Sequence, residues 1–363
     1  MIKNEYKSLR INNIFHDEDS LRRIIEQKFE DTSIASWEKD IYAFIQSWIS
    51  DQDFIEVNTS GSTGTPKLIR LYKSVLINSA IYTAEALSFK ENENALLCLP
   101  AKYIAGKMMI IRAFVNNMNL IIKEPSSNPL SDNHFNIDFA AMIPLQVSNI
   151  LKSKDVGKLK MVRNLIIGGG AIDPNIEKAL KDFPNNVYAT YGMTETATHI
   201  ALKKLNSTAK HNYYHCLFGI TVRKGSDQCL IINAPHISPE EIKTNDLANI
   251  YSDTQFEIIG RKDNIINTGG IKIIPEVLES KIKQFINYNL FVSSLPDQEL
   301  GEKLILVIEN SVKDLNCLYT LWKNLEANLE KHEVPKRIEY LDSFIYTGNG
   351  KINRRECMEM LKS

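Results

Sequence analysis

Apolar and polar residues follow two different periods along this chain. In residues 36–49 large apolar side chains recur at helical spacing, which predicts one amphipathic helix. They are Trp37, Ile41, Phe44, Ile45 and Trp48. From residue 54, short apolar runs alternate with longer helical patterns, as in FIEV, KLIRLY, SVLINSAIYTAEAL, ALLCLP and AGKMMIIRAFV. This repeated order of strand, helix and strand predicts an α/β fold, with a mainly parallel sheet covered by helices on both faces.

The pattern changes twice in the second half of the chain. After about residue 200 the strand-like pieces become short, as in LFGITV, CLIINA, ANIYS and FEIIG, so we expect a small β-rich subdomain over about 200–259. Past Gly260, IPEVLESKIKQF and LYTLWKNLEANLE have helical spacing, whereas LFVSSL and LILVIE are typical of strands. We therefore expect a large N-terminal domain, residues 1–262, and a smaller α+β domain, residues 263–363. The polar stretch SSNPLSDNH, residues 126–134, predicts an exposed loop.

Composition and charge indicate a folded, soluble protein. The 363 residues exceed the roughly 150 of one ordinary domain, and 44% hydrophobic with 24% charged residues is an ordinary globular mixture. The sequence has 43 basic and 44 acidic residues, so its net charge is −1. An overall positive potential that would attract a nucleic acid or an acidic membrane is therefore not expected. The five cysteines lie far apart, the stretch MIKNEYKSLRINN lacks the apolar segment typical of a leader peptide, and no apolar run approaches about 20 residues. We expect a cytoplasmic protein without a membrane span.

The first candidate for chemistry is 59-TSGSTGTPK-67, which lies between two apparent strands. Its glycines and hydroxyl side chains offer N–H and O–H donors to phosphate oxygens, and Lys67 adds a positive charge. A Walker A loop is excluded, because Pro66 stands where its second glycine belongs and Leu68 follows the lysine. The structural alternative is a flexible Ser/Thr/Gly linker, and the closing Pro-Lys favours a phosphate-binding loop over it.

Two further motifs follow apparent strands. In 191-YGMTETATH-199, Tyr191 could stack on a purine, Thr194 could donate to a phosphate and Glu195 could hold a divalent cation. In 168-GGGA-171, the glycines permit close approach of a flat ligand to the backbone. Taken singly, both motifs have ordinary structural explanations, which are helix capping for the first and a tight strand-to-helix turn for the second.

The C-terminal part holds two more glycine-rich segments. One is 260-GRKDNIINTGGIKIIPEVLE-279, which combines a charged pivot, a Gly-Gly turn and a helix start. The other is 347-TGNGKINRRE-356, which presents Lys351, although an exposed lysine in a polar tail usually serves only solubility. His211 and His215, followed by Cys216, have a spacing suited to zinc, but the neighbouring tyrosines and short strands favour a packed loop.

In this order, the motifs resemble those of the acyl- and aryl-CoA synthetases of the adenylate-forming superfamily. They are TSGSTGTPK, GGGA, YGMTE, T-x-D at 244–246, GRKD, GGIKI and GNGK, and they cover residues 55 to 356 approximately. The resemblance implies an enzyme that uses ATP, Mg²⁺ and CoA, adenylates a carboxylic acid with loss of pyrophosphate, and then transfers the acyl group to the CoA thiol. It also implies a mobile C-terminal domain that turns about Asp263 between the two steps.

Family roles are carried over motif by motif. The phosphate loop implied by the resemblance consists of Thr59, Ser60, Gly61, Ser62, Thr63, Gly64 and Lys67. The implied adenine slot consists of Gly169, Gly170, Ala171, Tyr191 and Gly192. In the family pattern Thr194 contacts the α-phosphate, Glu195 holds Mg²⁺ and Lys351 reaches the reacting atoms during adenylation. Asp246 and Arg261 match the residues that hold the ribose hydroxyls, while the CoA side corresponds to Gly269, Gly270 and Lys272.

Three stretches are most similar to the o-succinylbenzoate-CoA ligases of menaquinone biosynthesis, and they are residues 99–114, 142–151 and 257–276. Such a ligase activates one of two carboxylates, so the spare one needs a buried cation. The implied acyl pocket consists of Tyr103, Gly106, Lys107, Arg112, Gly168 and His199. Arg112 is the first candidate for the spare carboxylate and Lys107 the second. Alternatively, either cation extends from an ordinary helix to solvent.

The chain departs from the family pattern at several places. Tyr103 stands where many relatives have histidine, so only an aromatic wall is carried over, and Asn245 replaces the usual glycine beside Asp246. Only 58 residues precede Thr59, so we expect a reduced N-terminal subdomain, and a homodimer could cover what it leaves exposed.

Other functions remain open at this point. One is a ligase for another aryl or fatty acid, and a second is an adenylating enzyme with a carrier-protein thiol as acceptor. A third is a protein of the same fold that only binds nucleotides. It is disfavoured because a protein without catalysis has no reason to keep the charged residues Lys67, Glu195, Asp246, Arg261 and Lys351.

Overall fold

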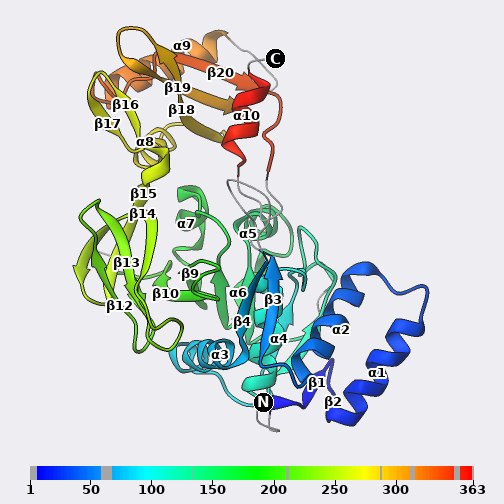
Figure 1. The fold of residues 1–363 in the computed structure, drawn as a ribbon. Helices are drawn as coiled ribbons and strands as arrows, with labels where there is room; N and C mark the ends of the chain where they lie inside the picture. Colours follow the sequence, from blue (N-terminus) through cyan, green and yellow to red (C-terminus); the bar gives the residue numbers. More distant parts are fainter. Residues whose placement is uncertain are drawn as a thin grey trace. The chain divides into compact units, whose positions relative to one another are not determined.

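The computed structural model describes residues 6–58, 68–132, 134–209, 212–286, 288–310, 315–346 and 352–361. The chain forms two compact units (Figure 1). The first consists of Met1–Thr221 and Asn233–Ile242, and the second of Val222–Ile232 and Lys243–Ser363.

The first unit is built on a large sheet whose strand order is β11-β10-β9-β8-β7-β5-β6-β1-β2. Its strands are β1 (Leu9–Ile11), β2 (Ile14–His16), β5 (Asn94–Leu97), β6 (Asn119–Ile122), β7 (Phe139–Met142), β8 (Asn164–Ile167), β9 (Asn186–Gly192), β10 (His199–Lys204) and β11 (Tyr214–Cys216). The six strands from β9 to β1 pair in parallel, whereas β10 is antiparallel to β9 and to β11. The predicted parallel sheet is confirmed.

Helices cover this sheet on both faces, as the sequence predicts. They are α1 (Glu18–Glu30), α2 (Ser36–Ile49), α3 (Lys73–Leu87), α4 (Ile104–Val115), α5 (Pro144–Leu151), α6 (Val156–Met161) and α7 (Pro174–Leu180). Alternate strand residues such as Leu96, Ala140 and Leu165 pack on α5, α6 and α7. On the opposite face Phe139 packs against Phe89 and the Arg112 side chain, beside α3 and α4. Every residue of β7 and β8 is buried, as expected for parallel strands covered twice.

A separate hairpin pairs β3 (Phe54–Asn58) with β4 (Leu68–Tyr72) in antiparallel register, with Asn58 opposite Leu68. The candidate phosphate loop, residues 59–67, connects these two strands and lies outside the described residues.

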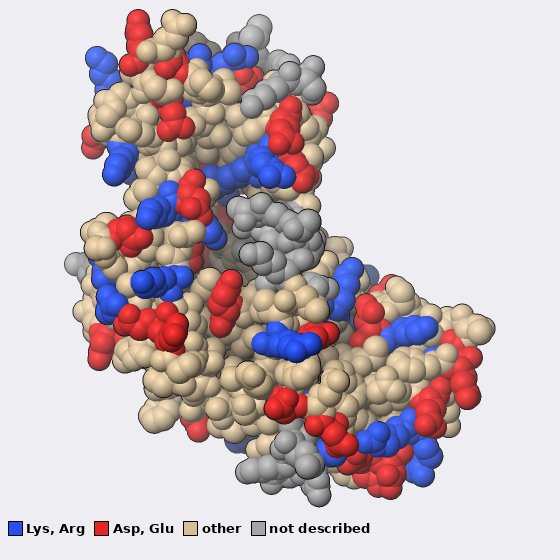
Figure 2. Space-filling view, viewed as in Figure 1, with Lys and Arg blue, Asp and Glu red and all other residues tan. Residues whose placement is uncertain are grey.

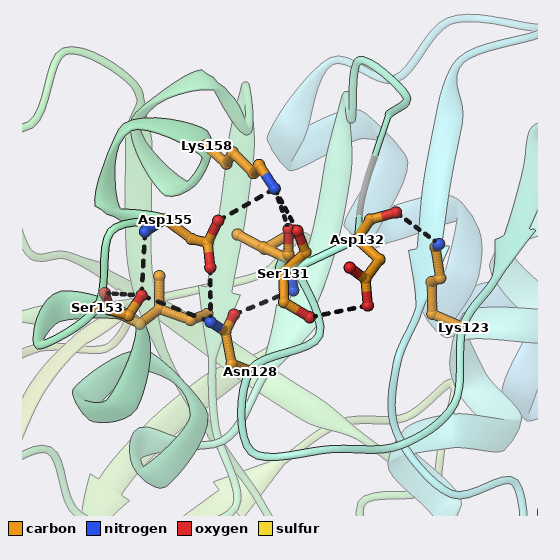
Figure 3. Close-up of polar contacts among 9 residues, drawn as sticks. Lys123, Asn128, Ser131, Asp132, Ser153, Asp155 and Lys158 are labelled. Carbon is orange, nitrogen blue, oxygen red and sulfur yellow. Dashed lines mark hydrogen bonds and ion pairs between the residues drawn. The ribbon is translucent and has the colours of Figure 1, made fainter.

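The segment after β6, residues 126–134, makes more hydrogen bonds to the rest of the unit than its polar sequence suggests. Leu130 is fully buried, and its backbone N–H donates to Asn128 Oδ1 at 3.2 Å. Asn128 Nδ2 donates to Asp155 Oδ2 at 2.8 Å, and Lys158 Nζ donates to the carbonyls of Leu130 and Ser131 (Figure 3). Hydrogen bonds from Lys158 and then Asn128 lower the pKa of Asp155. The prediction of a simple exposed loop over 126–134 is wrong for its buried middle, because Leu130 is buried and the side chains of Asn128 and of Lys158 in α6 bond to the backbone around it.

Asn128→Ala removes three of these hydrogen bonds, two donated by the amide and one accepted by it. We expect it to lower the free energy of unfolding by about 1–2 kcal/mol, because it leaves the Leu130 N–H without its acceptor. Urea unfolding measures this change. Ser127→Ala, at an exposed neighbouring position, serves as the control and is expected to change stability by less than about 0.5 kcal/mol. An equal decrease in the free energy of unfolding of the two variants would show that the Asn128 hydrogen bonds contribute nothing to stability.

The second unit contains four strands at one end of the large sheet's order, β12-β13-β14-β15, and a five-stranded sheet of its own. The order in the five-stranded sheet is β17-β16-β19-β18, with β20 beside β19. The strands are β12 (Thr221–Lys224), β13 (Cys229–Asn233), β14 (Ile242–Ser252), β15 (Gln255–Arg261), β16 (Ile266–Thr268), β17 (Ile271–Ile273), β18 (Leu290–Asp297), β19 (Gly301–Glu309) and β20 (Arg337–Leu341). The helices are a 3₁₀ turn, Lys262–Asn264, and α8 (Pro275–Ile282), α9 (Leu315–Asn328) and α10 (Arg354–Met360).

The division between the units differs from the expected border at residues 262 and 263. Most of β12–β15 groups with the C-terminal part, although the sequence places this β-rich region in the N-terminal domain. The packing of α8 against β15 accounts for the grouping, since a Cβ at Gly260 would lie 2.4 Å from the Ile274 side chain and 2.6 Å from Glu276 Oε2. Rotation about Asp263 stays a prediction.

Glu279 gives the second unit a pH-dependent stability. Burial raises the pKa of Glu279 to about 7, although Arg354 Nη2, 2.9 Å from its Oε2, acts in the opposite direction. The folded state therefore binds the Glu279 proton more tightly than the unfolded state. The stability that the neutral carboxyl contributes is complete below about pH 4.5 and is lost as the pH rises through 7. Relative to Glu279→Gln, we expect the wild-type free energy of unfolding to fall by on the order of 3 kcal/mol across this range. Denaturant unfolding at pH 5, 6.5 and 8 measures the difference, and a difference that does not change with pH would contradict the assignment.

Acidic and basic side chains are interspersed over the face of the molecule shown in Figure 2, in keeping with the net charge of −1. Among the described residues, no helix is long and apolar enough to span a bilayer.

Candidate active site

Two glycine-bearing turns meet at the carboxyl ends of β8 and β9. These strands pair in parallel, with Ile167 opposite Ala189, so the turns that follow them lie side by side. A Cβ at Gly168 would lie 2.3 Å from Thr190 Oγ1, and Gly169 has a φ of +83°. Only glycine fits these two positions without strain. The structure thus brings the predicted adenine-slot residues Gly169, Gly170 and Ala171 next to Tyr191 and Gly192, at the sheet edge where α/β proteins bind ligands.

The turn that carries Thr194 and Glu195 is held from inside by a residue that the sequence analysis did not select. Thr196 is fully buried, and its Oγ1 accepts the Met193 N–H at 2.9 Å and donates to the Thr198 carbonyl at 2.7 Å. Glu195 is exposed and Thr194 half-buried. Both side chains therefore project from a turn whose backbone is fixed by an internal hydroxyl.

Helix α4 begins beside this edge and carries most of the predicted acyl pocket. Tyr103 is its N-cap residue, and a Cβ at Gly106 would lie 2.4 Å from the Pro100 carbonyl oxygen. The glycine is therefore needed for the close approach of α4 to the segment that follows β5. This close packing is a structural reason for Gly106, in addition to the role implied by the resemblance.

Arg112 and His199 are brought together in the interior, 2% and 7% exposed. Arg112 Nη2 donates to His199 Nδ1 at 3.3 Å and to Thr198 Oγ1 at 3.2 Å. Burial lowers the pKa of Arg112 to about 9, which leaves the guanidinium charged at neutral pH. Burial, with the charge of Arg112 as the smaller cause, lowers the pKa of His199 well below its ordinary value, so the ring is neutral. Because His199 pairs with Gly192 across the β9–β10 hairpin, this buried cation lies behind the Gly192 turn.

Lys107 does not join this group. Its ammonium lies 4.9 Å from the ring centroid of Phe44, which belongs to α2. Burial lowers the pKa of Lys107, while Asp40, also in α2, acts in the opposite direction. The two cations that the sequence offers for a spare carboxylate thus lie on different sides of α4.

In the second unit, the predicted ribose-binding residues face each other across two strands. Asp246 of β14 is the register partner of Arg261 of β15, and Arg261 Nη1 lies 4.0 Å from Asp246 Oδ1. Arg261 Nη2 also donates to Asp263 Oδ2 at 3.1 Å, and Asn245 Nδ2 donates to the same oxygen at 3.1 Å. The replacement of the usual glycine by Asn245 therefore adds a contact to the predicted hinge residue.

The Gly-Gly segment forms a two-residue hairpin turn between β16 and β17. Thr268 pairs with Ile271, and Gly269 and Gly270 have φ values of +58° and +82°. Positive φ at both central residues is the type I′ geometry that closes a tight hairpin. The turn displays Lys272, which is exposed on β17.

Several predicted residues fall outside the part of the chain that the structure describes. They are the phosphate loop 59–67, Lys351 and His211. Within the described ranges, no three His, Cys, Asp or Glu side chains gather as a metal site would require. A Mg²⁺ site built from Glu195 and phosphate oxygens fits the exposed carboxylate, because Mg²⁺ commonly takes one or two carboxylates together with substrate oxygens.

Gln146 is a second buried polar residue that the sequence analysis did not select. It is 4% exposed, and its Nε2 donates to the Cys98 carbonyl at 3.2 Å and to the Ser126 carbonyl at 2.9 Å. Its Oε1 accepts the Ile143 N–H at 3.2 Å. It ties together segments that follow β5, β6 and β7. Proline at the first helical position followed by glutamine at the third is a capping signature that the sequence does contain.

Known proteins resemble this chain in sequence and in fold. The family model described as AMP-binding enzyme matches residues 20–223. An acyl-CoA synthetase (AMP-forming)/AMP-acid ligase II-like protein from Dyadobacter fermentans is 33% identical, and the alignment covers 92% of this chain and 97% of that chain with a TM-score of 0.61. The 2-succinylbenzoate--CoA ligase of Listeria monocytogenes is 22% identical, with 94% of this chain and 77% of that protein covered.

The o-succinylbenzoate coenzyme A synthetase (MenE) of Bacillus subtilis, solved with ATP and magnesium ion, has the same fold. It is 18% identical, with 93% of this chain and 82% of that chain covered and a TM-score of 0.70. Because the family model spans more than half of the sequence and a 33% identical relative aligns with 92% of it, the chain belongs to the AMP-binding enzyme family.

Proposed function

We propose that the protein is an ATP-dependent acid:CoA ligase that forms AMP, with o-succinylbenzoate as its acid. The observation that carries the proposal is the meeting of the Gly168–Ala171 turn with the Tyr191–Glu195 turn at the carboxyl edge of the parallel sheet. The names of the relatives from Listeria monocytogenes and Bacillus subtilis support the choice of acid.

The residues of this chain fit ATP in chemical type. The side-chain-free backbone at Gly168 and Gly169 allows a flat base to approach beside Tyr191. Asp246 supplies acceptors and Arg261 a fixed fork of donors, a combination suited to ribose hydroxyls. Thr194 is assigned to the α-phosphate, Glu195 to Mg²⁺ and Lys67 with its loop to the outer phosphates. Mg²⁺, when bound, neutralises charge on the polyphosphate.

Two half-reactions follow from this assignment. In the first, a carboxylate oxygen of the acid bonds to the α-phosphorus of ATP, and the bond to pyrophosphate breaks. Charge develops on the phosphoryl oxygens, where the Thr194 hydroxyl and the Lys351 ammonium stabilise it. In the second, the sulfur of the CoA thiolate bonds to the acyl carbon and AMP leaves. We assign Gly269, Gly270 and Lys272 to the CoA side, and turning about Asp263 to the change between the two steps.

The choice of a dicarboxylic acid rests on Arg112. Its guanidinium is buried, and its Nε has no hydrogen-bond partner among the described residues. Burying a positive charge without an anionic partner is unfavourable by roughly several kcal/mol. The carboxylate of o-succinylbenzoate that is not activated is such an anion. Tyr103 and Gly168 are assigned to the walls of the same pocket.

A cytoplasmic location and a homodimer are part of the proposal. The location is supported by the free thiols of Cys98, Cys216, Cys229 and Cys357. Gel filtration with light scattering tests the dimer.

ATP–pyrophosphate exchange without CoA tests the proposed function. The panel contains o-succinylbenzoate, its analogue without the aryl carboxylate (4-oxo-4-phenylbutanoate), benzoate and a fatty acid. We expect exchange to be fastest with o-succinylbenzoate. Equal exchange with benzoate would exclude the proposed acid, and no exchange with any acid would leave a nucleotide-binding protein of the same fold.

A further inference from the structure

A chain of hydrogen bonds runs through the interior from helix α3 to Arg112. Thr83 Oγ1 lies 2.8 Å from the Ser79 carbonyl oxygen and 3.3 Å from His199 Nε2. On the other side of the ring, His199 Nδ1 lies 3.3 Å from Arg112 Nη2. Thr83 is fully buried, so water does not compete for these contacts.

The chemistry of the three side chains determines which atom donates in each of these hydrogen bonds. A guanidinium can only donate, so His199 Nδ1 accepts from Arg112. The His199 ring is neutral, because burial lowers its pKa well below the ordinary value, so its single N–H is on Nε2. That N–H donates to Thr83 Oγ1, and the Thr83 hydroxyl donates to the Ser79 carbonyl.

The opposite tautomer of His199 is incompatible with this arrangement. A proton on Nδ1 would face the N–H of Arg112, so two donors would meet and the guanidinium would have to move. The Thr83 hydroxyl offers the acceptor that keeps the proton on Nε2. The Thr198 hydroxyl lies 3.2 Å from the same Arg112 nitrogen and gives the guanidinium its second neutral acceptor. It also lies 3.4 Å from His199 Nδ1, where its own proton can be donated to the unprotonated nitrogen.

The Arg112 guanidinium keeps hydrogen-bonding capacity that the described chain does not use. Nη2 is occupied by Thr198 and His199, whereas Nη1 reaches, within the described ranges, only the Met109 sulfur at 3.9 Å. Nε is buried and has no partner among the described residues. Buried polar groups in native proteins nearly always have partners, so an unused edge of a buried guanidinium points to an anionic ligand.

We propose that Thr83 is a positioning residue of the acyl site, which sets the tautomer of His199 and, through that ring, aims the Arg112 guanidinium at the second carboxylate of a dicarboxylic acid. This inference rests on the proposed function, because the ligase supplies the dicarboxylic acid. It adds to that function a residue on α3, 29 positions before Arg112 in the sequence, that contacts no substrate.

Two variants of Thr83 separate positioning from packing. Thr83→Val keeps the shape and removes the hydroxyl, and Thr83→Ser keeps the hydroxyl. The ratio of kcat/KM for o-succinylbenzoate to kcat/KM for 4-oxo-4-phenylbutanoate is measured for each. We expect the ratio to fall about tenfold in Thr83→Val and to stay within about twofold of wild type in Thr83→Ser. A merely structural role would lower both values of kcat/KM equally and leave the ratio unchanged, which would overturn the proposal.

The imidazole ¹⁵N spectrum gives a measurement that does not depend on activity. His199 is assigned by the signals that His199→Gln removes. We expect wild type and Thr83→Ser to carry the proton on Nε2, and Thr83→Val to shift protonation toward Nδ1. A wild-type ring protonated on Nδ1, or an unchanged tautomer in Thr83→Val, would overturn the proposal. If neither acid is adenylated, the proposed function fails, and the tautomer still decides whether Thr83 sets the His199 ring.

Discussion

Lys351→Ala is expected to slow adenylation of the acid by about 10²–10³-fold, because we assign this cation to the place where charge develops in the transition state. Pyrophosphate release in single-turnover experiments measures this step. The second half-reaction, started from supplied acyl-adenylate and CoA, is expected to stay within about threefold of wild type, since the lysine is assigned to the first step alone.

Lys331→Ala is the matched control, because it removes a lysine of the same unit from an exposed position. It is expected to leave both half-reactions unchanged. Equal slowing of the two half-reactions by Lys351→Ala would contradict the assignment, and so would adenylation at the wild-type rate.

Arg112→Met is expected to abolish the preference for a dicarboxylic acid. The substitution keeps an unbranched apolar stem and removes the charge, so the spare carboxylate is buried without a partner. We expect kcat/KM for o-succinylbenzoate to fall by about 10²–10³-fold, the effect of leaving a buried charge unpaired. With 4-oxo-4-phenylbutanoate, which lacks that carboxylate, the change is expected to be less than about fivefold. Steady-state kinetics with the two acids measures both values.

Lys107→Met makes the same chemical change five residues earlier on the same helix. Because the Lys107 ammonium lies against Phe44 of α2, the ratio between the two acids is expected to stay at the wild-type value. If Lys107→Met lost the preference for o-succinylbenzoate and Arg112→Met kept it, Lys107 and not Arg112 would be the partner of the spare carboxylate.

Elements with a strong period could be predicted from the sequence, and those with few buried residues could not. The five large apolar residues of 36–49 predict α2, and its bounds Ser36–Ile49 confirm the prediction. Helix α1 buries only Leu21 and Ile25 in 13 residues, so its pattern is too sparse to recognise. Helix α10 buries only Cys357 and lies in a stretch that the sequence suggests is a polar tail.

The position of the candidate site followed from topology. Turns after parallel strands meet at one sheet edge, and this topology brings together the motifs after β8 and β9, which the resemblance places in one adenine slot. The separation of Lys107 from Arg112 follows from helix geometry, since five residues rotate a helix by about 140° relative to its starting face. The contact between Arg112 and His199, 87 positions apart, depends on tertiary packing that no local pattern encodes.

The hydrogen-bonding residues that support the site were the hardest to predict. Thr83, Gln146 and Thr196 bond mainly to backbone or to one ring nitrogen, and such roles leave no characteristic spacing in a sequence. The grouping of the β-rich region was not evident from the sequence for a related reason. Its grouping with the C-terminal part depends on packing between β15 and α8, which short strand patterns do not reveal.

Product analysis of the complete reaction is the decisive test of the proposed ligase activity. Purified protein is incubated with o-succinylbenzoate, ATP, Mg²⁺ and CoA, and the nucleotides and thioesters are separated and identified by mass. We expect one AMP, one pyrophosphate and one o-succinylbenzoyl-CoA for each ATP consumed, with no thioester when ATP is omitted. Formation of ADP and phosphate in place of AMP and pyrophosphate, or ATP consumption without any thioester, would exclude this activity.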